Sequence, residues 1–192
     1  MAFRREKWPY KPYPLTKTLV LVGMMGCGKT SIAMRLAKIY RKPHVDLDFE
    51  VEKAAGCKVA EVFRLYGEAE FRRGEEKIMA RLLDGPECIL STGGGSFLSE
   101  KTRSLAKQKA VTLFLDADVA TIIRNTKGRT HRPLLNNAEH PEQLIEKLIA
   151  ERRPFYEQSD LKLTYQNETF TSLLEKIDAL LRDYMRQKEN KP

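Results

Sequence analysis

The chain has 192 residues, of which 42% are hydrophobic and 31% are charged, so it is long enough for one domain with a packed core and too apolar for wholesale disorder. It contains no apolar run of the roughly 18 residues that a membrane span requires, and its N-terminus lacks the apolar segment of a secretory signal. The three cysteines include no C-x-x-C pair, which argues against a disulfide framework or a zinc site and favours a cytoplasmic protein. The formal charge of +8 suits anionic ligands, but half of the excess lies in residues 1–17, so we expect neither a nucleic acid nor a membrane as the partner.

Predicted strands and helices alternate along the chain. Short apolar runs predict strands at residues 18–23, 44–48, 88–90, 110–116 and 161–165. Helical spacing predicts helices at residues 31–40, from 50 onward, over 59–83 with a break at Gly67, and over 142–156 and 172–187. This alternation predicts an α/β doubly wound fold whose five-stranded parallel sheet is covered on both faces by helices.

A single domain is expected over residues 17–186. A basic, proline-containing and flexible extension precedes it at residues 1–16, and a short C-terminal tail follows at 187–192.

Directly after the first predicted strand comes GMMGCGKT, which has the glycine and lysine spacing of a P-loop. Glycines let backbone N–H groups curl around phosphate oxygens, and the N-terminus of the following helix adds partial positive charge. Lys29 is expected to reach the β- and γ-phosphates, and Thr30 to ligate Mg²⁺. The pattern therefore predicts that ATP is bound by Gly23, Met24, Met25, Gly26, Cys27, Gly28, Lys29 and Thr30.

Two carboxylates follow the second predicted strand. Asp46 and Asp48 are two residues apart, so we expect both on one side of the strand end, at the edge of the sheet that faces the ligand crevice. One carboxylate there can serve Mg²⁺ while the other accepts a proton from an attacking hydroxyl. The alternative is a pair of turn residues.

Four further motifs have a structural and a functional interpretation. In EFRRGEEK, the i, i+3 spacing of Arg72 and Glu75 places both on one helix face, as in a surface ion pair or an oriented binding arginine. THRPLL and ERRPFY each place an arginine just before a proline, which fixes the backbone there. The structural interpretation is that the proline only ends a helix. STGGGSFL follows a predicted strand with three glycines, either as a flexible turn or to admit a ligand close to the backbone.

The motifs GMMGCGKT, DLD, FRRGE, ILSTGGG, HRPLL and RRPFY, in this order over roughly residues 18–184, resemble those of the shikimate kinase family. The resemblance implies a P-loop nucleoside-kinase-like fold with strand order 2-3-1-4-5 and a mobile lid at about residues 121–137. It implies transfer of the ATP γ-phosphate, with Mg²⁺, to the 3-hydroxyl of shikimate in the chorismate pathway. We expect a monomer.

The resemblance also implies roles by position. Lys29, Asp48 and Arg132 would be catalytic, Arg132 closing from the lid onto the ATP phosphates, and Thr30 and Asp46 would serve the metal. Shikimate would be held by Asp48, Phe63, Arg72, Gly94 and Arg152, with Phe71 as a second lining ring, Glu75 fixing Arg72, and Arg153 as the less favoured neighbour of Arg152.

The chain departs from the family pattern at Asn125, where many members carry a further lid arginine; Arg124 or Arg129 are the alternatives. Two other functions fit the P-loop: another small-molecule kinase, such as gluconate kinase, or a non-catalytic module that binds nucleotide or nucleic acid. The D-x-D pair, the triple glycine and the RPLL motif argue against the first of these. The presence of Lys29, Asp48 and Arg132 together argues against the second.

Overall fold

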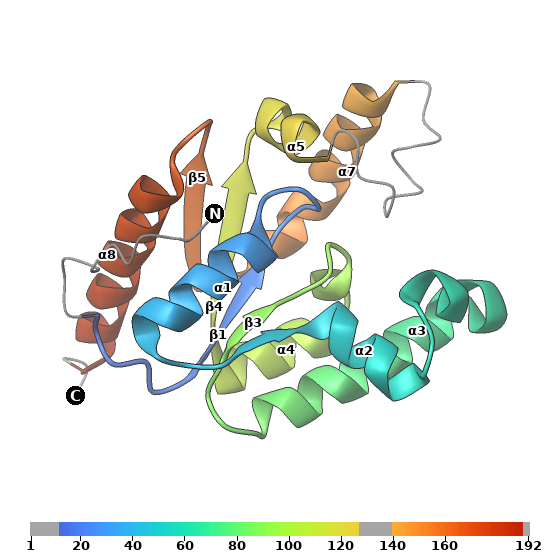
Figure 1. The fold of residues 1–192 in the computed structure, drawn as a ribbon, viewed down its shortest axis with the longest axis horizontal. Helices are drawn as coiled ribbons and strands as arrows, with labels where there is room; N and C mark the ends of the chain where they lie inside the picture. Colours follow the sequence, from blue (N-terminus) through green and yellow to red (C-terminus); the bar gives the residue numbers. More distant parts are fainter. Residues whose placement is uncertain (1–11, 127–139, 190–192) are drawn as a thin grey trace, which may run out of the picture.

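A five-stranded sheet lies at the centre of the computed structural model, which describes residues 12–126 and 140–189 (Figure 1). The strands lie side by side in the order β2-β3-β1-β4-β5, and every neighbouring pair is parallel. The doubly wound fold and the predicted strand order are therefore both confirmed. The strands are β1 Thr18–Val22, β2 His44–Asp46, β3 Ile89–Ser91, β4 Ala110–Ala117 and β5 Leu161–Tyr165.

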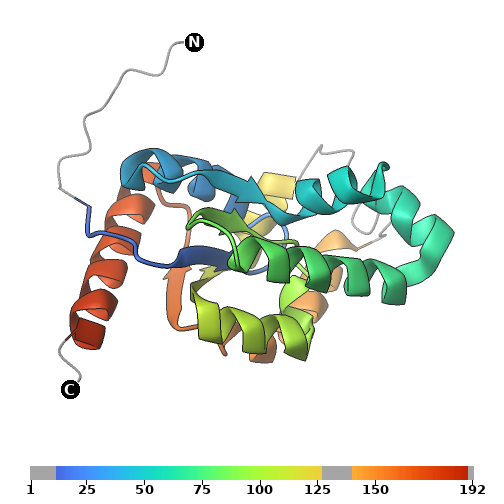
Figure 2. The ribbon, with the colours of Figure 1, turned by 90° about the horizontal axis from the view of Figure 1, so that it is seen from below.

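Helices connect the strands and cover the sheet, as the two views at right angles show (Figures 1 and 2). A short 3₁₀ helix, η1, follows β3 at Ser96–Leu98. The α-helices are α1 Lys29–Tyr40, α2 Leu47–Ala55, α3 Val59–Leu83, α4 Glu100–Lys109, α5 Val119–Thr126, α7 Pro141–Tyr156 and α8 Phe170–Glu189.

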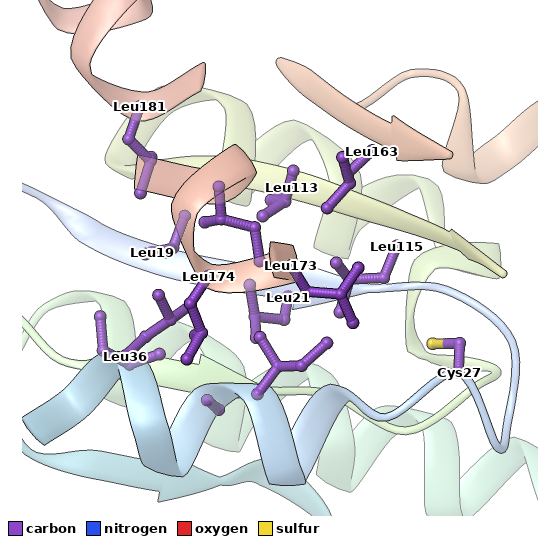
Figure 3. Close-up of a cluster of buried hydrophobic side chains, with 14 of the residues drawn as sticks. Leu19, Leu21, Cys27, Leu36, Leu113, Leu115, Leu163, Leu173, Leu174 and Leu181 are labelled. Carbon is purple, nitrogen blue, oxygen red and sulfur yellow. The ribbon is translucent and has the colours of Figure 1, made fainter. Parts of the chain in front are cut away.

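The sheet divides the core into two apolar clusters. Leu19 and Leu21 of β1 pack with α1 and α8 on one face (Figure 3), whereas Val20 and Val22 belong to the cluster on the other face. All five residues of β1 are buried. A central parallel strand is covered on both faces, which is why its sequence is a continuous apolar run rather than an alternating one.

The second strand is shorter than predicted, and this changes the position of one candidate residue. β2 ends at Asp46, and α2 begins at Leu47. The reason is an N-cap: Asp46 Oδ1 accepts the Phe49 backbone N–H at 3.3 Å, which favours helix over strand from the next residue. Asp48 therefore lies in the first turn of a helix, not at a strand end.

The predicted break in the long helix is present. Gly67 has φ 77° and ψ 171° inside α3, and a Cβ there would meet nothing within 4 Å. Space is thus available for a side chain, and the positive φ is what favours glycine.

Both predicted ends of the domain need correction within the described ranges. Leu15 is only 6% exposed and belongs to the core, and the Tyr13 hydroxyl donates to Glu189. Residues 12–16 are therefore anchored to the domain rather than forming part of a flexible extension. α8 continues to Glu189, so residues 187–189 are helical and not a tail. None of the helices described is both long and apolar enough to cross a membrane.

Candidate active site

The P-loop connects β1 to α1 at the carboxyl edge of the sheet (Figure 1). Gly23, Gly26 and Gly28 have positive φ, so the loop takes a path that side chains with a Cβ would resist. Lys29 begins α1, and its buried ammonium donates to the carbonyls of Gly23 at 2.8 Å and Met24 at 3.0 Å. The predicted nucleotide-binding lysine therefore lies against the loop that would hold the phosphates.

Oxygen ligands gather beside this loop. Thr30 Oγ1 donates to Asp46 Oδ2 at 3.1 Å, and Ser91 Oγ donates to the same oxygen at 2.8 Å. Mg²⁺ in kinases is held through one or two carboxylates plus substrate phosphates and waters, so one carboxylate with two hydroxyls fits this metal. In the part of the chain described, there is no group of three or more His, Cys, Asp or Glu residues that would form an all-protein cage.

Asp48 faces the glycine turn after β3. Burial raises the pKa of its carboxyl to about 6, with further raising by the negative charges of Asp46 and Glu75, while Lys29 and Arg72 lower it. A carboxyl group that titrates close to neutral pH can both bind a hydroxyl and accept its proton. The helical position of Asp48 thus leaves its predicted chemistry possible.

Arg72 and Glu75 form the ion pair that their spacing predicts. Arg72 Nη1 donates to Glu75 Oε2 at 2.7 Å, and Nη2 donates to Glu68 Oε1 at 3.2 Å. Glu75 is only 1% exposed, and its other oxygen accepts the Ser96 hydroxyl. Because both oxygens of Glu75 have donors, the buried carboxylate is satisfied and can fix the guanidinium.

Two aromatic rings lie beside this pair. The centroids of Phe63 and Phe71 are 4.4 Å apart with their planes tilted by 32°, and Arg72 Cζ is 5.1 Å from the Phe71 centroid. Phe71 is buried and Phe63 half-buried, so the rings offer an apolar wall next to a cation.

The three glycines after β3 each make room for a different part of the site. A Cβ at Gly93 would lie 2.6 Å from Asp48 Oδ1, and one at Gly95 would lie 2.8 Å from Arg72 Cζ. A Cβ at Gly94 would lie 3.3 Å from the Met25 backbone nitrogen. The alternative of a merely flexible turn does not explain these contacts, because the turn is packed on all three sides by candidate site residues.

The two adjacent arginines of α7 contact different parts of the protein. Arg152 Nη1 donates to the Gly94 carbonyl at 3.3 Å, whereas Arg153 donates two hydrogen bonds, at 2.9 and 2.8 Å, to the buried Asp116. Pro154 lies inside the helix, which continues to Tyr156, so the RRPFY proline does not stop it. Of the two arginines, only Arg152 contacts the glycine turn.

Several residues of this site had no role in the sequence analysis. Ser91 donates to Asp46, and His44 Nε2 lies 3.1 Å from Ser91 Oγ. Tyr156 donates to the Gly94 carbonyl. Ser91 and Tyr156 lie within the ILSTGGG and RRPFY motifs, which is the only signal that marks them; His44 lies in no motif.

On the lid side, the structure describes only residues 121–126 of the predicted segment, so Arg132 and Arg129 lie outside the described residues. Asn125 Nδ2 donates to the Gly26 carbonyl at 2.9 Å, which ties α5 to the P-loop. Arg124 Nη1 donates to Asn167 Oδ1 at 2.7 Å.

Comparison with known proteins agrees with this geometry. The sequence model of the shikimate kinase family matches residues 25–182. A shikimate kinase of Bradyrhizobium diazoefficiens is 41% identical over 169 residues, which cover 88% of this chain and 81% of the relative. The chain belongs to the shikimate kinase family. It is an ATP-dependent kinase that phosphorylates shikimate and uses Mg²⁺.

Solved structures give the same family. A shikimate kinase from Acinetobacter baumannii in complex with shikimate is 30% identical, with a TM-score of 0.81 over 87% of this chain and 93% of the other. A gluconokinase from Sinorhizobium meliloti is 16% identical, with a TM-score of 0.58 over 93% of this chain and 97% of the other. The second likeness shows the fold alone, so gluconate kinase, the alternative weighed from the sequence, is not favoured.

Proposed function

We propose that Lys29, Asp48 and Arg132 are the catalytic residues with which this kinase transfers the ATP γ-phosphate to the 3-hydroxyl of shikimate. The observation that carries the proposal is the glycine turn of residues 93–95, which packs against the P-loop on one side and against Asp48 and Arg72 on the others. A phosphate held by the loop and a hydroxyl held at Asp48 would thus meet at one place.

Each group has a distinct task in this proposal. The P-loop N–H groups and Lys29 bind the phosphates, and Thr30 and Asp46 hold Mg²⁺, which when bound neutralises charge on the phosphate oxygens. Asp48 binds the accepting hydroxyl of shikimate and takes its proton as that oxygen bonds to the γ-phosphorus, while the bond from this phosphorus to the bridging oxygen breaks and ADP leaves. The raised pKa of Asp48 supports this task, because a stronger base accepts the proton more readily.

Arg72 and Arg152 are proposed to bind the shikimate carboxylate. Their guanidinium groups flank consecutive residues of one turn, Gly95 and Gly94, and so approach the same volume from α3 and α7. Glu75 orients Arg72. The aromatic rings of Phe63 and Phe71 cover the apolar face of the shikimate ring. Arginine suits a carboxylate better than lysine, since its planar fork donates two parallel hydrogen bonds.

Arg132 lies outside the described residues, and its role rests on the HRPLL motif alone. We propose that it belongs to a lid and places positive charge on the transferring phosphoryl group. Arg132→Ala should then lower turnover far more than it changes shikimate affinity. Normal turnover in this variant would contradict the assignment.

The proposal as a whole is tested by coupled measurement of ADP release. With saturating ATP, turnover should require both shikimate and Mg²⁺, and gluconate should not replace shikimate. Equal ADP release with and without shikimate would overturn it.

We further propose a monomer that acts in the cytoplasm. Every group invoked here comes from one chain, and the three cysteines are free thiols, as is usual in a reducing compartment. The kinase domain is proposed to include residues 12–189, because residues 12–16 contact the core and α8 continues to Glu189. Light scattering that gives twice the 22.1 kDa mass of the chain would contradict the monomer.

A further inference from the structure

His44 begins the edge strand β2 and lies on the same side of it as Asp46, two residues later. In the register of β2 with β3, Asp46 is opposite Ser91, and His44 is diagonal to it. His44 Nε2 and Ser91 Oγ are 3.1 Å apart. The imidazole is therefore connected to the Asp46 carboxylate through one hydroxyl.

The direction of these hydrogen bonds follows from the groups themselves. A carboxylate oxygen only accepts, and Asp46 Oδ2 lies 2.8 Å from Ser91 Oγ and 3.1 Å from Thr30 Oγ1. The single hydroxyl hydrogen of Ser91 is assigned to Asp46, because this charged oxygen at 2.8 Å is a nearer and stronger acceptor than an unprotonated His44 Nε2 at 3.1 Å or the Val45 carbonyl at 3.4 Å. Ser91 Oγ is then left to accept, so His44 must supply an Nε2–H.

We propose that His44 is a positioning residue for the Mg²⁺ side of the site. By donating to Ser91 Oγ, it fixes the position of this hydroxyl oxygen and keeps the hydroxyl hydrogen directed at Asp46. The carboxylate is then held in the orientation in which it faces Thr30. This inference rests on the proposed role of Asp46 in holding the metal.

The proposal differs from a purely structural role in what it makes His44 affect. A residue that only packs at the start of an edge strand would alter the stability of the fold. A residue that acts through Ser91 on Asp46 would alter the contribution of Mg²⁺ to nucleotide binding and leave nucleotide binding without metal unchanged. The two can be separated without measuring turnover.

The experiment compares ADP affinity with Mg²⁺ and with EDTA, by calorimetry, for single and double variants. His44→Phe keeps a planar ring without a donor, and His44→Gln places an amide N–H at the same number of bonds from the backbone. We expect His44→Phe to lose roughly three- to tenfold of the affinity gained with Mg²⁺, the size of one hydrogen bond, and His44→Gln to keep most of that gain. His44→Met is a second donor-free variant in case the first does not fold.

Ser91→Ala completes the cycle. If His44 acts through Ser91, His44→Phe combined with Ser91→Ala should lose no more of the Mg²⁺ gain than Ser91→Ala alone. Additive losses, or a full Mg²⁺ gain in both donor-free variants, would overturn the proposal. Asp46→Asn separates the two levels: if it keeps the gain, the metal role of Asp46 fails, whereas loss in Asp46→Asn with none in His44→Phe refutes only the role of His44.

Discussion

Replacing Gly95 by alanine would place one methyl group where the Arg72 guanidinium lies. The new Cβ would be 2.8 Å from Arg72 Cζ and 2.9 Å from Nη1, closer than such atoms can approach. The substitution causes no backbone strain, since Gly95 has φ −102° and ψ −9°, which alanine adopts freely. The guanidinium, at the end of a flexible side chain, must therefore move away from the turn.

The size of the effect follows from the bond that is lost. A hydrogen bond to a charged group contributes about 1.5–3 kcal/mol, so losing the one that we propose between Arg72 and the shikimate carboxylate should weaken shikimate binding by roughly ten- to 150-fold. ADP affinity should stay within about twofold of the wild type, because the P-loop borders Gly94 rather than Gly95.

Calorimetry with shikimate and with ADP measures both effects, and Gly74→Ala is the matched control. Gly74 lies on α3 two residues after Arg72, and a Cβ there would meet nothing within 4 Å. This control should bind shikimate normally and gain about 0.5–1 kcal/mol of stability from its helical alanine. A folded Gly95→Ala variant with unchanged shikimate affinity would refute the argument that this glycine makes room for Arg72.

Three further predictions concern neighbouring groups. Arg152→Ala should weaken shikimate binding at least tenfold in calorimetry. Arg153→Ala should keep that affinity and lower the free energy of unfolding in urea by about 1–3 kcal/mol, because it removes a partner of buried Asp116. If Arg153→Ala instead weakened shikimate binding and Arg152→Ala did not, the two roles would have to be exchanged. Without nucleotide and metal, shikimate affinity should fall as pH decreases through about 6, since protonated Asp48 no longer offers a carboxylate, and Asp48→Asn should remove this dependence; an unchanged slope in that variant would exclude Asp48. Gly67→Ala should lower the thermal stability by about 1–3 kcal/mol, because alanine at φ 77° is strained, and an unaltered melting temperature would show that α3 rearranges there.

Much of the fold could be predicted because its signals are local. A short apolar run predicts a buried strand without knowledge of the rest of the fold. In the same way, a glycine within a helical pattern, such as Gly67, predicts a break in the helix. The start of α2 was missed because Asp46 satisfies two patterns at once, a strand end and a helix N-cap, and only the hydrogen bond to Phe49 decides between them. Leu15 was placed in a flexible extension because its neighbours are basic and proline-rich, whereas its own burial depends on distant helices.

The site was predictable where spacing along one element determines contact. The i, i+3 relation of Arg72 and Glu75 is such a case. Arg152 and Arg153 are neighbours in sequence, but successive helical residues point about 100° apart, and only the packing of α7 decides which one faces the turn. No sequence pattern marked His44 as a site residue. Its contact with Ser91, 47 residues later, depends on the register of β2 with β3.

The glycine turn after β3 has a consequence for how strongly each ligand changes the affinity for the other. Gly94 borders the backbone of Met25 in the P-loop, while its carbonyl accepts from Arg152, which we propose to bind shikimate. A nucleotide that shifts this peptide therefore shifts the Arg152 guanidinium, and a bound carboxylate that pulls on Arg152 acts back on the P-loop. Thermodynamic linkage requires the two effects to be equal: whatever factor ADP applies to the dissociation constant of shikimate, shikimate applies to that of ADP.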